Sequence, residues 1–418
     1  MPTKPARRSL FVFADWEGQD LRPMGELTAT PSRAAEVFSF SYDDAWLKSP
    51  GARLLDPDLG LYPGPQYLGA AHKSNFGLFL DSAPDRWGRL LLRRREAAQA
   101  RAEGRAERSL RESDYLLGVH DAQRLGGLRF KDRPDGPFLG EGGGAPVPPW
   151  ASLRELEHAS LSLERDDAAD DPAYEDWLAL LLAPGTSLGG ARPKAGVADP
   201  EGRLWIAKFP RRRDERDHAA WELVAHDLAR AAGIRVADAA VKRLSSGGRT
   251  FLTRRFDRTA SGARVHFASA MTMLGRVDGE SASYLDLVEI IAKHGARPDE
   301  DCAELWRRVV FSIAVANTDD HLRNHGFLLR PDGWRLSPAY DLNPEPHGRG
   351  LSLSISENDN ALDFDLAWSV RGYFRLSDAR AAEIMSRVKE TVSGWEHAAR
   401  RLDIPSSELA SMRGAFVR

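Results

Sequence analysis

Residues 317–324 read Asn317-Thr318-Asp319-Asp320-His321-Leu322-Arg323-Asn324. Within this stretch, Asp319 and Asn324 have the D-x-x-x-x-N spacing found in the catalytic loops of kinases. In such loops the aspartate takes the proton of the acceptor hydroxyl, and the asparagine helps to hold Mg²⁺ against the nucleotide phosphates. The pattern alone is a weak signal, because Asp and Asn also cap helices and occur in ordinary solvated loops.

The flanking sequence places this stretch between a helix and a hairpin. Upstream, an apolar stripe at helical spacing predicts a helix that ends near Asn317; the stripe consists of Leu305, Trp306, Val309, Val310, Ile313 and Ala316. Downstream, the turn Pro331-Asp332-Gly333 separates two short apolar strands. Because Asn324 precedes this hairpin and Asp341 follows it, we expect the two side chains to converge. Two such oxygen ligands suit Mg²⁺, which keeps several waters and binds substrate phosphates.

A glycine-rich segment further upstream could hold those phosphates. Residues 184–194 read PGTSLGGARPK. Glycines let backbone N–H groups approach phosphate oxygens closely, and the final Lys194 would add a mobile charge. The segment is neither a Walker A loop nor a G-x-G-x-x-G loop, so a plain Gly/Pro connection is the alternative interpretation.

Residues 196–210 predict a second hairpin with its turn at Asp199-Pro200-Glu201-Gly202. The return strand carries Lys208 among apolar neighbours, and a strand lysine of this kind reaches the α- and β-phosphates in kinases. The alternative is a solvent-facing lysine on an edge strand. A helix is expected from about 217 to 232, and its Glu222 could either pair with Lys208 or be a solvated helix acid.

In combination, these motifs resemble the HipA family of serine/threonine kinases, known as bacterial toxins. The resemblance covers nearly the whole chain and rests on residues 187–194 and 207–210, Arg255-Phe256-Asp257-Arg258, residues 317–324 and Tyr340-Asp341-Leu342, with weaker matches at 10–13, 37–42 and 116–130. It implies an α+β, protein-kinase-like two-lobed fold with a mainly helical C-terminal lobe and an N-terminal α/β accessory subdomain. The expected domains are 1–135 (accessory), 136–149 (Gly/Pro linker) and 150–418 (kinase), with the N-lobe ending near 260 and the helical lobe covering 261–418.

The resemblance also implies roles for individual residues. Asp319 would be the catalytic base, Asn324 and Asp341 would ligate Mg²⁺, and ATP would be the phosphate donor. The implied nucleotide-binding residues are Ser187, Gly189, Gly190, Ala191, Arg192, Pro193, Lys194, Lys208, Arg254, Arg255, Phe256, His321, Asn324, Tyr340 and Asp341. Ser187 matches the serine that family members phosphorylate on themselves, and a phosphoserine there should expel the loop by charge repulsion. The alternative for Ser187 is a turn serine that bonds its own backbone.

Three functions follow from the resemblance and the motifs. The first is a toxin-type protein kinase that acts on an aminoacyl-tRNA synthetase or a similar translation factor. Its partner would be a HipB-like helix-turn-helix antitoxin, which would also bring it to operator DNA. The second is a weakly active co-repressor in an antitoxin–DNA complex, and the third is a small-molecule phosphotransferase.

Composition sets outer bounds on these hypotheses. The 418 residues allow two domains with proper cores, and a net charge of −3 gives no global attraction to nucleic acid or to an anionic membrane. A single cysteine, Cys302, excludes an internal disulfide framework. With neither a signal peptide nor an apolar span in the sequence, we expect a cytoplasmic protein. The arginine-rich stretch 86–112 is either a solvated face laced with ion pairs or a contact to a partner or to DNA phosphates.

Overall fold

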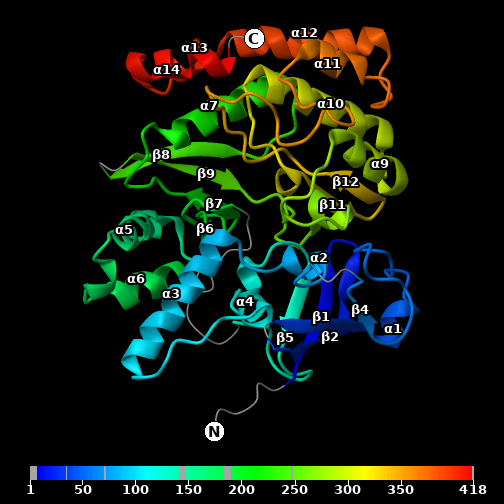
Figure 1. The fold of residues 1–418 in the computed structure, drawn as a ribbon, viewed down its shortest axis with the longest axis vertical. Coiled ribbons are helices and arrows are strands. Elements are labelled where there is room, and N and C mark those ends of the chain that lie inside the picture. Colours follow the sequence, from blue (N-terminus) through cyan, green and yellow to red (C-terminus); the bar gives the residue numbers. More distant parts are fainter. Residues whose placement is uncertain are drawn as a thin grey trace. The chain divides into compact units, whose positions relative to one another are not determined.

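The computed structural model describes residues 7–33, 35–69, 72–140, 147–182, 190–245 and 248–416. The chain divides into two compact units (Figure 1). The first comprises Met1–Arg212, Asp257–Ala268 and Gly275–Val277, and the second comprises Arg213–Phe256, Ser269–Leu274 and Asp278–Arg418. The domain boundaries expected near 135 and 150 do not coincide with this division and stay predictions.

The first unit contains both strands and helices. Its strands are β1 (Arg8–Trp16), β2 (Gln19–Pro31), β3 (Glu36–Tyr42), β4 (Gln66–Tyr67), β5 (Leu128–Lys131), β6 (Lys194–Ala198) and β7 (Leu204–Lys208). Its helices are α1 (Asp44–Leu47), α2 (Gly77–Leu80), α3 (Arg86–Ala102), α4 (Glu112–Leu117), α5 (Leu153–Leu163) and α6 (Tyr174–Leu182), with 3₁₀ turns η1 (Asp121–Gln123), η2 (Trp150–Ser152) and η3 (Ala168–Asp170).

An antiparallel sheet in the order β4-β3-β2-β1-β5 forms the N-terminal part of this unit. Its strands alternate buried and partly exposed side chains, as the period of two along a strand requires. Phe40 of β3 packs against Phe79 with ring centroids 5.3 Å apart, and Phe79 in turn contacts Phe130 of β5. Residues 37–42, which carry one of the weaker matches to the family, lie on β3.

The arginine-rich stretch folds as α3 and α4, and its charges pair with one another. Arg89 makes a bidentate contact with Glu112, with both N–O distances at 2.7 Å. Glu96 is buried and accepts from Arg105 at 2.6 Å and from Arg108 at 3.1 Å. These contacts favour the interpretation of the stretch as an ion-paired structural face.

The hairpin expected at 196–210 is present as β6 and β7. The two strands pair antiparallel from Lys194 opposite Lys208 to Ala198 opposite Leu204. The strand begins two residues earlier than expected, so that Lys194, the last residue of the glycine-rich segment, is already part of the sheet.

The second unit is mainly helical. Its helices are α7 (His218–Ala231), α8 (Ala270–Met273), α9 (Tyr284–His294), α10 (Pro298–Ala314), α11 (Phe364–Ser369), α12 (Asp378–Ser393), α13 (Trp395–Arg400) and α14 (Ser406–Phe416), with the 3₁₀ turn η4 (Leu322–Asn324). Its strands are β8 (Ala239–Ser245), β9 (Gly248–Arg254), β11 (Gly326–Arg330) and β12 (Gly333–Leu336), and β10 (His266–Ser269) spans the border between the units in sequence.

Helix α10 forms the centre of the second unit, and α9, α11 and α12 pack around it (Figure 1). The predicted apolar stripe is buried along this helix, and Trp306 also donates from its indole to Ala367 O of α11 at 3.0 Å. The predicted helix end is confirmed to within three residues, because α10 stops at Ala314. This buried helix therefore provides a rigid support for the segment that follows it.

A second apolar cluster joins α7 to the C-terminal helices. The indole of Trp395 stacks on Phe416 at a centroid distance of 4.6 Å, and Trp221 of α7 lies 6.1 Å from Trp395. Ile384, Val388 and Val392 of α12 are buried, so the C-terminal segment contributes to the core of the second unit. In the parts of the chain that the structure describes, no helix is both long and apolar enough to cross a bilayer.

Candidate active site

The segment after α10 makes a sharp turn that fixes the start of the candidate catalytic loop. Ala316 has φ of 48°, in the left-handed region that L-residues rarely occupy. Asn317, which is 1% exposed, donates its backbone N–H to Ser312 O at 2.9 Å and accepts from Asn343 N at 3.0 Å through its side chain. The loop is therefore tied both to the helix before it and to the chain that follows Asp341.

The two adjacent aspartates of the loop lie in opposite environments. Asp319 is exposed, whereas Asp320 is 4% exposed. A base that takes a proton from a substrate hydroxyl must be accessible to that substrate. This difference supports Asp319 as the chemical group and assigns Asp320 to the support of the loop.

Asp320 is surrounded by polar groups from three segments, and two of these groups donate hydrogen bonds to it. Its Oδ2 accepts from the Tyr284 hydroxyl of α9 and from Ser312 Oγ of α10 at 3.3 Å, and its Oδ1 lies 3.0 Å from His325 Nε2. Burial by itself raises the pKa of the Asp320 carboxyl, but the neighbouring His325 and the hydrogen bond from Tyr284 outweigh burial and hold that pKa below its usual value. Burial and the neighbouring Asp320 raise the pKa of Tyr284, which therefore stays a donor.

Asn324 turns back onto the backbone of Asp319. Its side-chain Nδ2 donates to Asp319 O at 2.8 Å, and the residue is 7% exposed at the end of η4. This contact uses the amide nitrogen, so the amide oxygen is the atom suited to a cation. The five-residue spacing thus has a structural reason, because it closes a short loop that sets Asp319 and Asn324 side by side.

Asp341 stands on strained backbone beside this loop. Its φ is 60°, and its Oδ1 accepts from Asn343 Nδ2 at 2.9 Å. The neighbouring Tyr340 donates its hydroxyl to Arg323 O at 2.7 Å, which joins the segment before Asp341 to the segment before Asn324. The intervening hairpin pairs Phe327 with Leu336 at its base, as the turn signal predicts. Left-handed backbone at a residue with a Cβ costs free energy, and residues in this conformation cluster at active sites and ligand-binding segments.

Phe256, one of the three consecutive residues expected to bind the nucleotide, contacts Tyr340 through its ring. The rings of Phe256 and Tyr340 are 5.5 Å apart at an interplanar angle of 38°. Arg255 is buried, and Arg254 is exposed with its guanidinium 3.2 Å from Asp238. Phe256 is therefore the member of this trio that the structure places against the catalytic segment.

His321 lies at the start of η4. Its Nδ1 is buried and has no hydrogen-bond partner within the described residues. An unsatisfied buried nitrogen is costly, and a bound molecule or water that supplied a partner would relieve that cost. The position agrees with the expectation that His321 lies in the site.

Lys194 and Lys208, the two lysines expected to contact phosphates, differ in exposure. Lys208 ends β7 and is partly exposed, whereas Lys194 is 2% exposed, with its Nζ 3.1 Å from Asp85 Oδ2. The expectation of a mobile charge at Lys194 is therefore wrong, because burial and the carboxylate immobilise the ammonium. Glu222 on α7 is also buried, which removes the alternative of a solvated helix acid.

The glycine-rich segment is described from Gly190 onward, and Ser187 and Gly189 lie outside the described residues. Gly190 has φ of 87°, and the carbonyl of Ala191 accepts from Arg211 Nη2 at 2.5 Å. Arg192 Nη1 donates to Phe209 O at 3.2 Å, and Phe209 N donates to Pro193 O at 2.9 Å. These bonds attach the C-terminal half of the segment to the end of β7.

The donor set around Asn324 and Asp341 fits a hard cation. Across the described residues, no three His, Cys, Asp or Glu side chains gather as a metal site would require. An amide oxygen and a carboxylate do suit Mg²⁺, which takes one or two protein oxygens and completes its shell with waters and phosphates. The residues present therefore fit Mg²⁺ bound together with a nucleotide and do not suit a metal held by protein alone.

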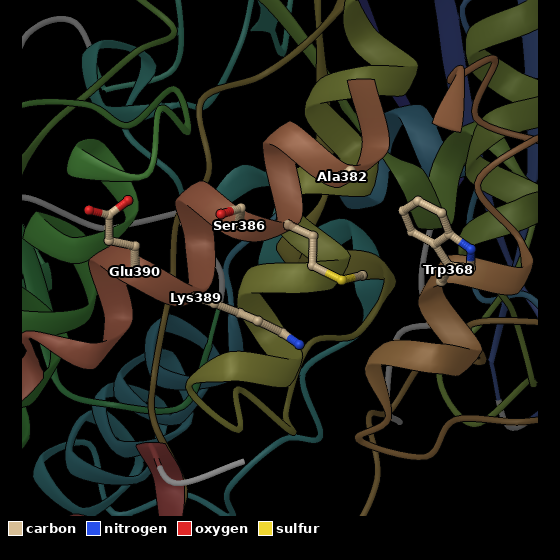
Figure 2. A pocket seen from close by; sticks show the side chains of 6 residues that line it. Trp368, Ala382, Ser386, Lys389 and Glu390 are labelled. Atoms are coloured by element: carbon tan, nitrogen blue, oxygen red, sulfur yellow. The ribbon is translucent and has the colours of Figure 1, made fainter. Parts of the chain in front are cut away.

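Hollows on the described surface of the second unit differ in their relation to this loop. A small enclosed one is bordered by Ser312, Asp320, Asn324, His325 and Tyr340, directly behind the catalytic loop. A larger open one of about 450 Å³ lies on α11 and α12, with Trp368 and Glu390 at opposite ends (Figure 2). Apart from Lys389 and Glu390 the larger hollow is lined by apolar or neutral side chains, so it offers no catalytic constellation.

Sequence reasoning missed the supporting residues of the site. Tyr284 lies 36 residues before Asp320, and no pattern in the sequence links the two. Asp85, the partner of Lys194, lies 109 residues away from it in a different region of the chain. A second aspartate beside Asp319 was the one visible signal, and its burial could not be read from a loop without periodicity.

A family model of known proteins matches the part of the chain that contains the candidate site. The family described as HipA-like C-terminal domain matches residues 186–395. Y4mE and Y4dM of Sinorhizobium fredii, both named as candidate kinases, are 31% identical over 148 residues and 32% identical over 165 residues. These matches cover 33% and 35% of this chain, and 33% and 38% of the two relatives, so about a third of each relative's length is matched.

A solved structure extends the likeness to the whole fold. It is the HipA–HipB toxin–antitoxin system of Shewanella oneidensis in complex with its operator DNA. The TM-score is 0.63 at 17% identity, and the alignment covers 97% of this chain and 94% of the other. The predicted α+β, kinase-like fold is therefore confirmed.

Proposed function

The chain belongs to the HipA family, whose C-terminal domain matches half of it, and from this membership we propose that it is an ATP- and Mg²⁺-dependent serine/threonine protein kinase. The observation that carries the proposal is the construction of residues 317–341. An exposed Asp319 stands on a loop closed by Asn324, beside an Asp341 held at φ of 60°. Kinase chemistry needs a base and two cation ligands in such an arrangement.

In the proposed reaction, Asp319 accepts the proton of the acceptor hydroxyl. The hydroxyl oxygen forms a bond to the γ-phosphorus of ATP, the bond from that phosphorus to the bridging oxygen breaks, and ADP leaves. Asn324 and Asp341 would hold Mg²⁺, which would supply positive charge to neutralise the phosphates. The main task of these residues is to position groups, because phosphoryl transfer requires little covalent chemistry from the protein.

The contacts to the nucleotide phosphates form the next part of the proposal. We assign these to Lys208 and to the backbone from Gly189 to Lys194, with Ser187 as the site of autophosphorylation. Phe256 and Tyr340 would lie on the adenine side, and the unsatisfied Nδ1 of His321 would find its partner in bound ligand or water.

A helix-turn-helix antitoxin is the proposed partner, with operator DNA bound mainly through it. Support comes from the fold likeness to a HipA that was solved together with HipB and operator DNA. An aminoacyl-tRNA synthetase or another translation factor is the proposed substrate class. Incubation with a purified panel of synthetases and labelled ATP would identify the acceptor.

Mass spectrometry of protein incubated with Mg-ATP tests the central proposal. Wild type should gain phosphate on a serine or threonine, and Asp319→Asn should lose about 100-fold to 10,000-fold in rate, since general base catalysis contributes factors of that size. Asp332→Asn is the matched control, because Asp332 is an exposed aspartate in the β11–β12 turn of the same unit. Equal phosphate on wild type and Asp319→Asn would contradict the assignment.

A further inference from the structure

A buried ion pair joins the start of α3 to the start of β6. Lys194 Nζ lies 3.1 Å from Asp85 Oδ2, and each side chain is 2% exposed. The partners are 109 residues apart in sequence and belong to the same unit. Asp85 is the N-cap of α3 and Lys194 is the first residue of β6, so regular secondary structure leaves the two groups little freedom to separate.

Two residues at the start of α3 hold the main chain and the side chain of Lys194. Asp85 is the N-cap of α3, and its Oδ1 accepts from Gly88 N at 2.7 Å while its Oδ2 faces the ammonium. Trp87 donates from its indole to the backbone carbonyl of Lys194 at 3.1 Å. Lys194 is thus held by its main chain and by its side chain at once.

The ammonium lies directly against the glycine-rich segment. A Cβ placed on Gly190 would lie 3.2 Å from Lys194 Nζ, which is tighter than most real contacts. Gly190 also has φ of 87°, which a residue with a side chain adopts only at a cost. Lys194 pairs in register with Lys208, the lysine assigned to the phosphates. The ion pair therefore lies beneath the end of the segment that would cover ATP.

Stability alone does not account for this pair. Two buried charges lose their hydration, and a pair of apolar residues is often as stable or more stable in such a place. Burial raises the pKa of Asp85 above its usual value even though Lys194 opposes the rise. Because the burial of these two charges costs so much hydration free energy, we explain the pair by the geometry that it imposes on Lys194 and not by a gain in stability.

We propose that the Asp85–Lys194 pair is a positioning device that holds residues 190–194 in the conformation that binds the ATP phosphates, so that helix α3 sets the affinity of the kinase for nucleotide. The inference deepens the proposed function and rests on it. It makes Asp85 a positioning residue, because it acts through Lys194 and through the backbone of residues 190–194.

The test uses three variants of the full chain. Asp85→Asn keeps an oxygen for the N-cap and removes the charge, Lys194→Met keeps the apolar stem, and the double variant removes both charges. Asp58→Asn is the matched control, because it breaks the Lys73–Asp58 ion pair of the same unit, whose side chains are 7% and 23% exposed. Thermal unfolding of each variant identifies any that fails to fold.

Hydrogen exchange of peptides that span residues 190–198 gives a readout that needs no nucleotide. Exchange should be at least tenfold faster in Asp85→Asn than in wild type and unchanged in Asp58→Asn. Equal exchange in wild type and in folded Asp85→Asn would overturn the inference. A wild type that binds no Mg-ATP in calorimetry would instead overturn the proposed function, so the two failures are distinguishable.

Kinetics then separate positioning from general damage. The KM for ATP should rise about tenfold in both single variants, kcat at saturating ATP should change less than threefold, and the double variant should resemble either single one, because residues that act as a unit are not additive. A fall in kcat with an unchanged KM, or effects that add in the double variant, would also overturn the inference.

Discussion

Charged side chains are used differently in the arginine-rich stretch 86–112 and in the segment 317–341. In the first, the carboxylates of Glu96 and Glu112 are bound by guanidinium groups at 2.6–3.1 Å. In the second, Asp319 is exposed on a closed loop and Asp341 stands at φ of 60°. The carboxylates of the first region are occupied by guanidinium groups, whereas a carboxylate placed on strained or exposed backbone is available for chemistry. We therefore expect substitutions in residues 317–341 to lower activity more than stability. Substitutions in the arginine-rich stretch should lower stability and leave activity unchanged.

The largest effect on activity with little effect on stability is expected for Asp341→Gly. Loss of a cation ligand should lower the phosphorylation rate by at least about 100-fold, comparable to the removal of a preorganised charge-stabilising group. Glycine relieves the left-handed strain but loses the hydrogen bond to Asn343, so the free energy of unfolding should stay within about 1 kcal/mol of wild type.

Kinase assays and urea unfolding of this variant provide the measurement. Asp403→Gly is the control, because Asp403 is exposed and has φ of 53° on the short connection between α13 and α14. It should keep full activity. If Asp341→Gly kept wild-type activity, Asp341 could not be a ligand of the reacting complex.

The next largest effect is expected for Asp320→Asn, which should change both properties. The asparagine cannot replace a carboxylate that faces Tyr284, Ser312 and His325, and a buried unsatisfied group costs about 1–3 kcal/mol. The displaced loop should lower kcat by about 10-fold to 100-fold, with a smaller change in KM. Urea unfolding and steady-state kinetics test this expectation, and an unchanged kcat would show that the network supports the fold alone.

A pH-dependent stability effect without loss of activity is expected for Glu96→Gln. Hydrogen bonds from Arg105 lower the pKa of Glu96 from 4.5 to about 2. A depressed pKa means that the folded state favours the charged carboxylate, so its contribution is fully present above about pH 4.5 and is lost as the pH falls towards 2.

Unfolding of wild type and Glu96→Gln between pH 2 and pH 7 measures this effect. The stability advantage of wild type should be constant near neutrality and should shrink below about pH 4.5, the usual value of the carboxyl. A difference that did not depend on pH would mean that the ion pairs of Glu96 do not depress its pKa. Phosphorylation at neutral pH should be unchanged in the variant.

The smallest effect is expected for Glu103→Gln in the same stretch. Its carboxylate pairs with Arg105, but the side chain is 61% exposed. Solvent-exposed ion pairs contribute from about 0 to 1 kcal/mol, so the unfolding free energy should change by less than about 0.5 kcal/mol. A larger loss would indicate that the exposed end of the network is coupled to the buried Glu96.

Much of the local structure followed from the sequence for simple reasons. The α10 stripe, the two hairpins and the α7 helix are encoded by apolar period and by Pro-Asp-Gly or Asp-Pro-Glu-Gly turns, and the structure has each of them. The convergence of the segments around Asn324 and Asp341 followed from hairpin geometry, and the Tyr340–Arg323 hydrogen bond agrees with it. The roles assigned to these residues stay predictions until they are tested in solution.

The expectation that Lys194 carries a mobile charge was wrong, and the reason is equally simple. A lysine that ends a glycine-rich loop is solvated unless another element covers it, and the covering element, α3, lies far away in sequence. Ser187 and Gly189 lie outside the described residues, so their predicted contacts are not addressed by the structure.

The sequence by itself determined the family, the secondary structure around the loop, and the spacing of Asp319 and Asn324, because these depend on residue type and short-range periodicity. Tertiary structure alone decided that Asp319 is exposed while Asp320 is buried, and that Lys194 is buried. It also decided that Tyr284 contacts Asp320 and that Asp85 contacts Lys194. Those properties depend on burial and on partners separated by 36 and by 109 residues, and no local pattern in a chain encodes such pairings.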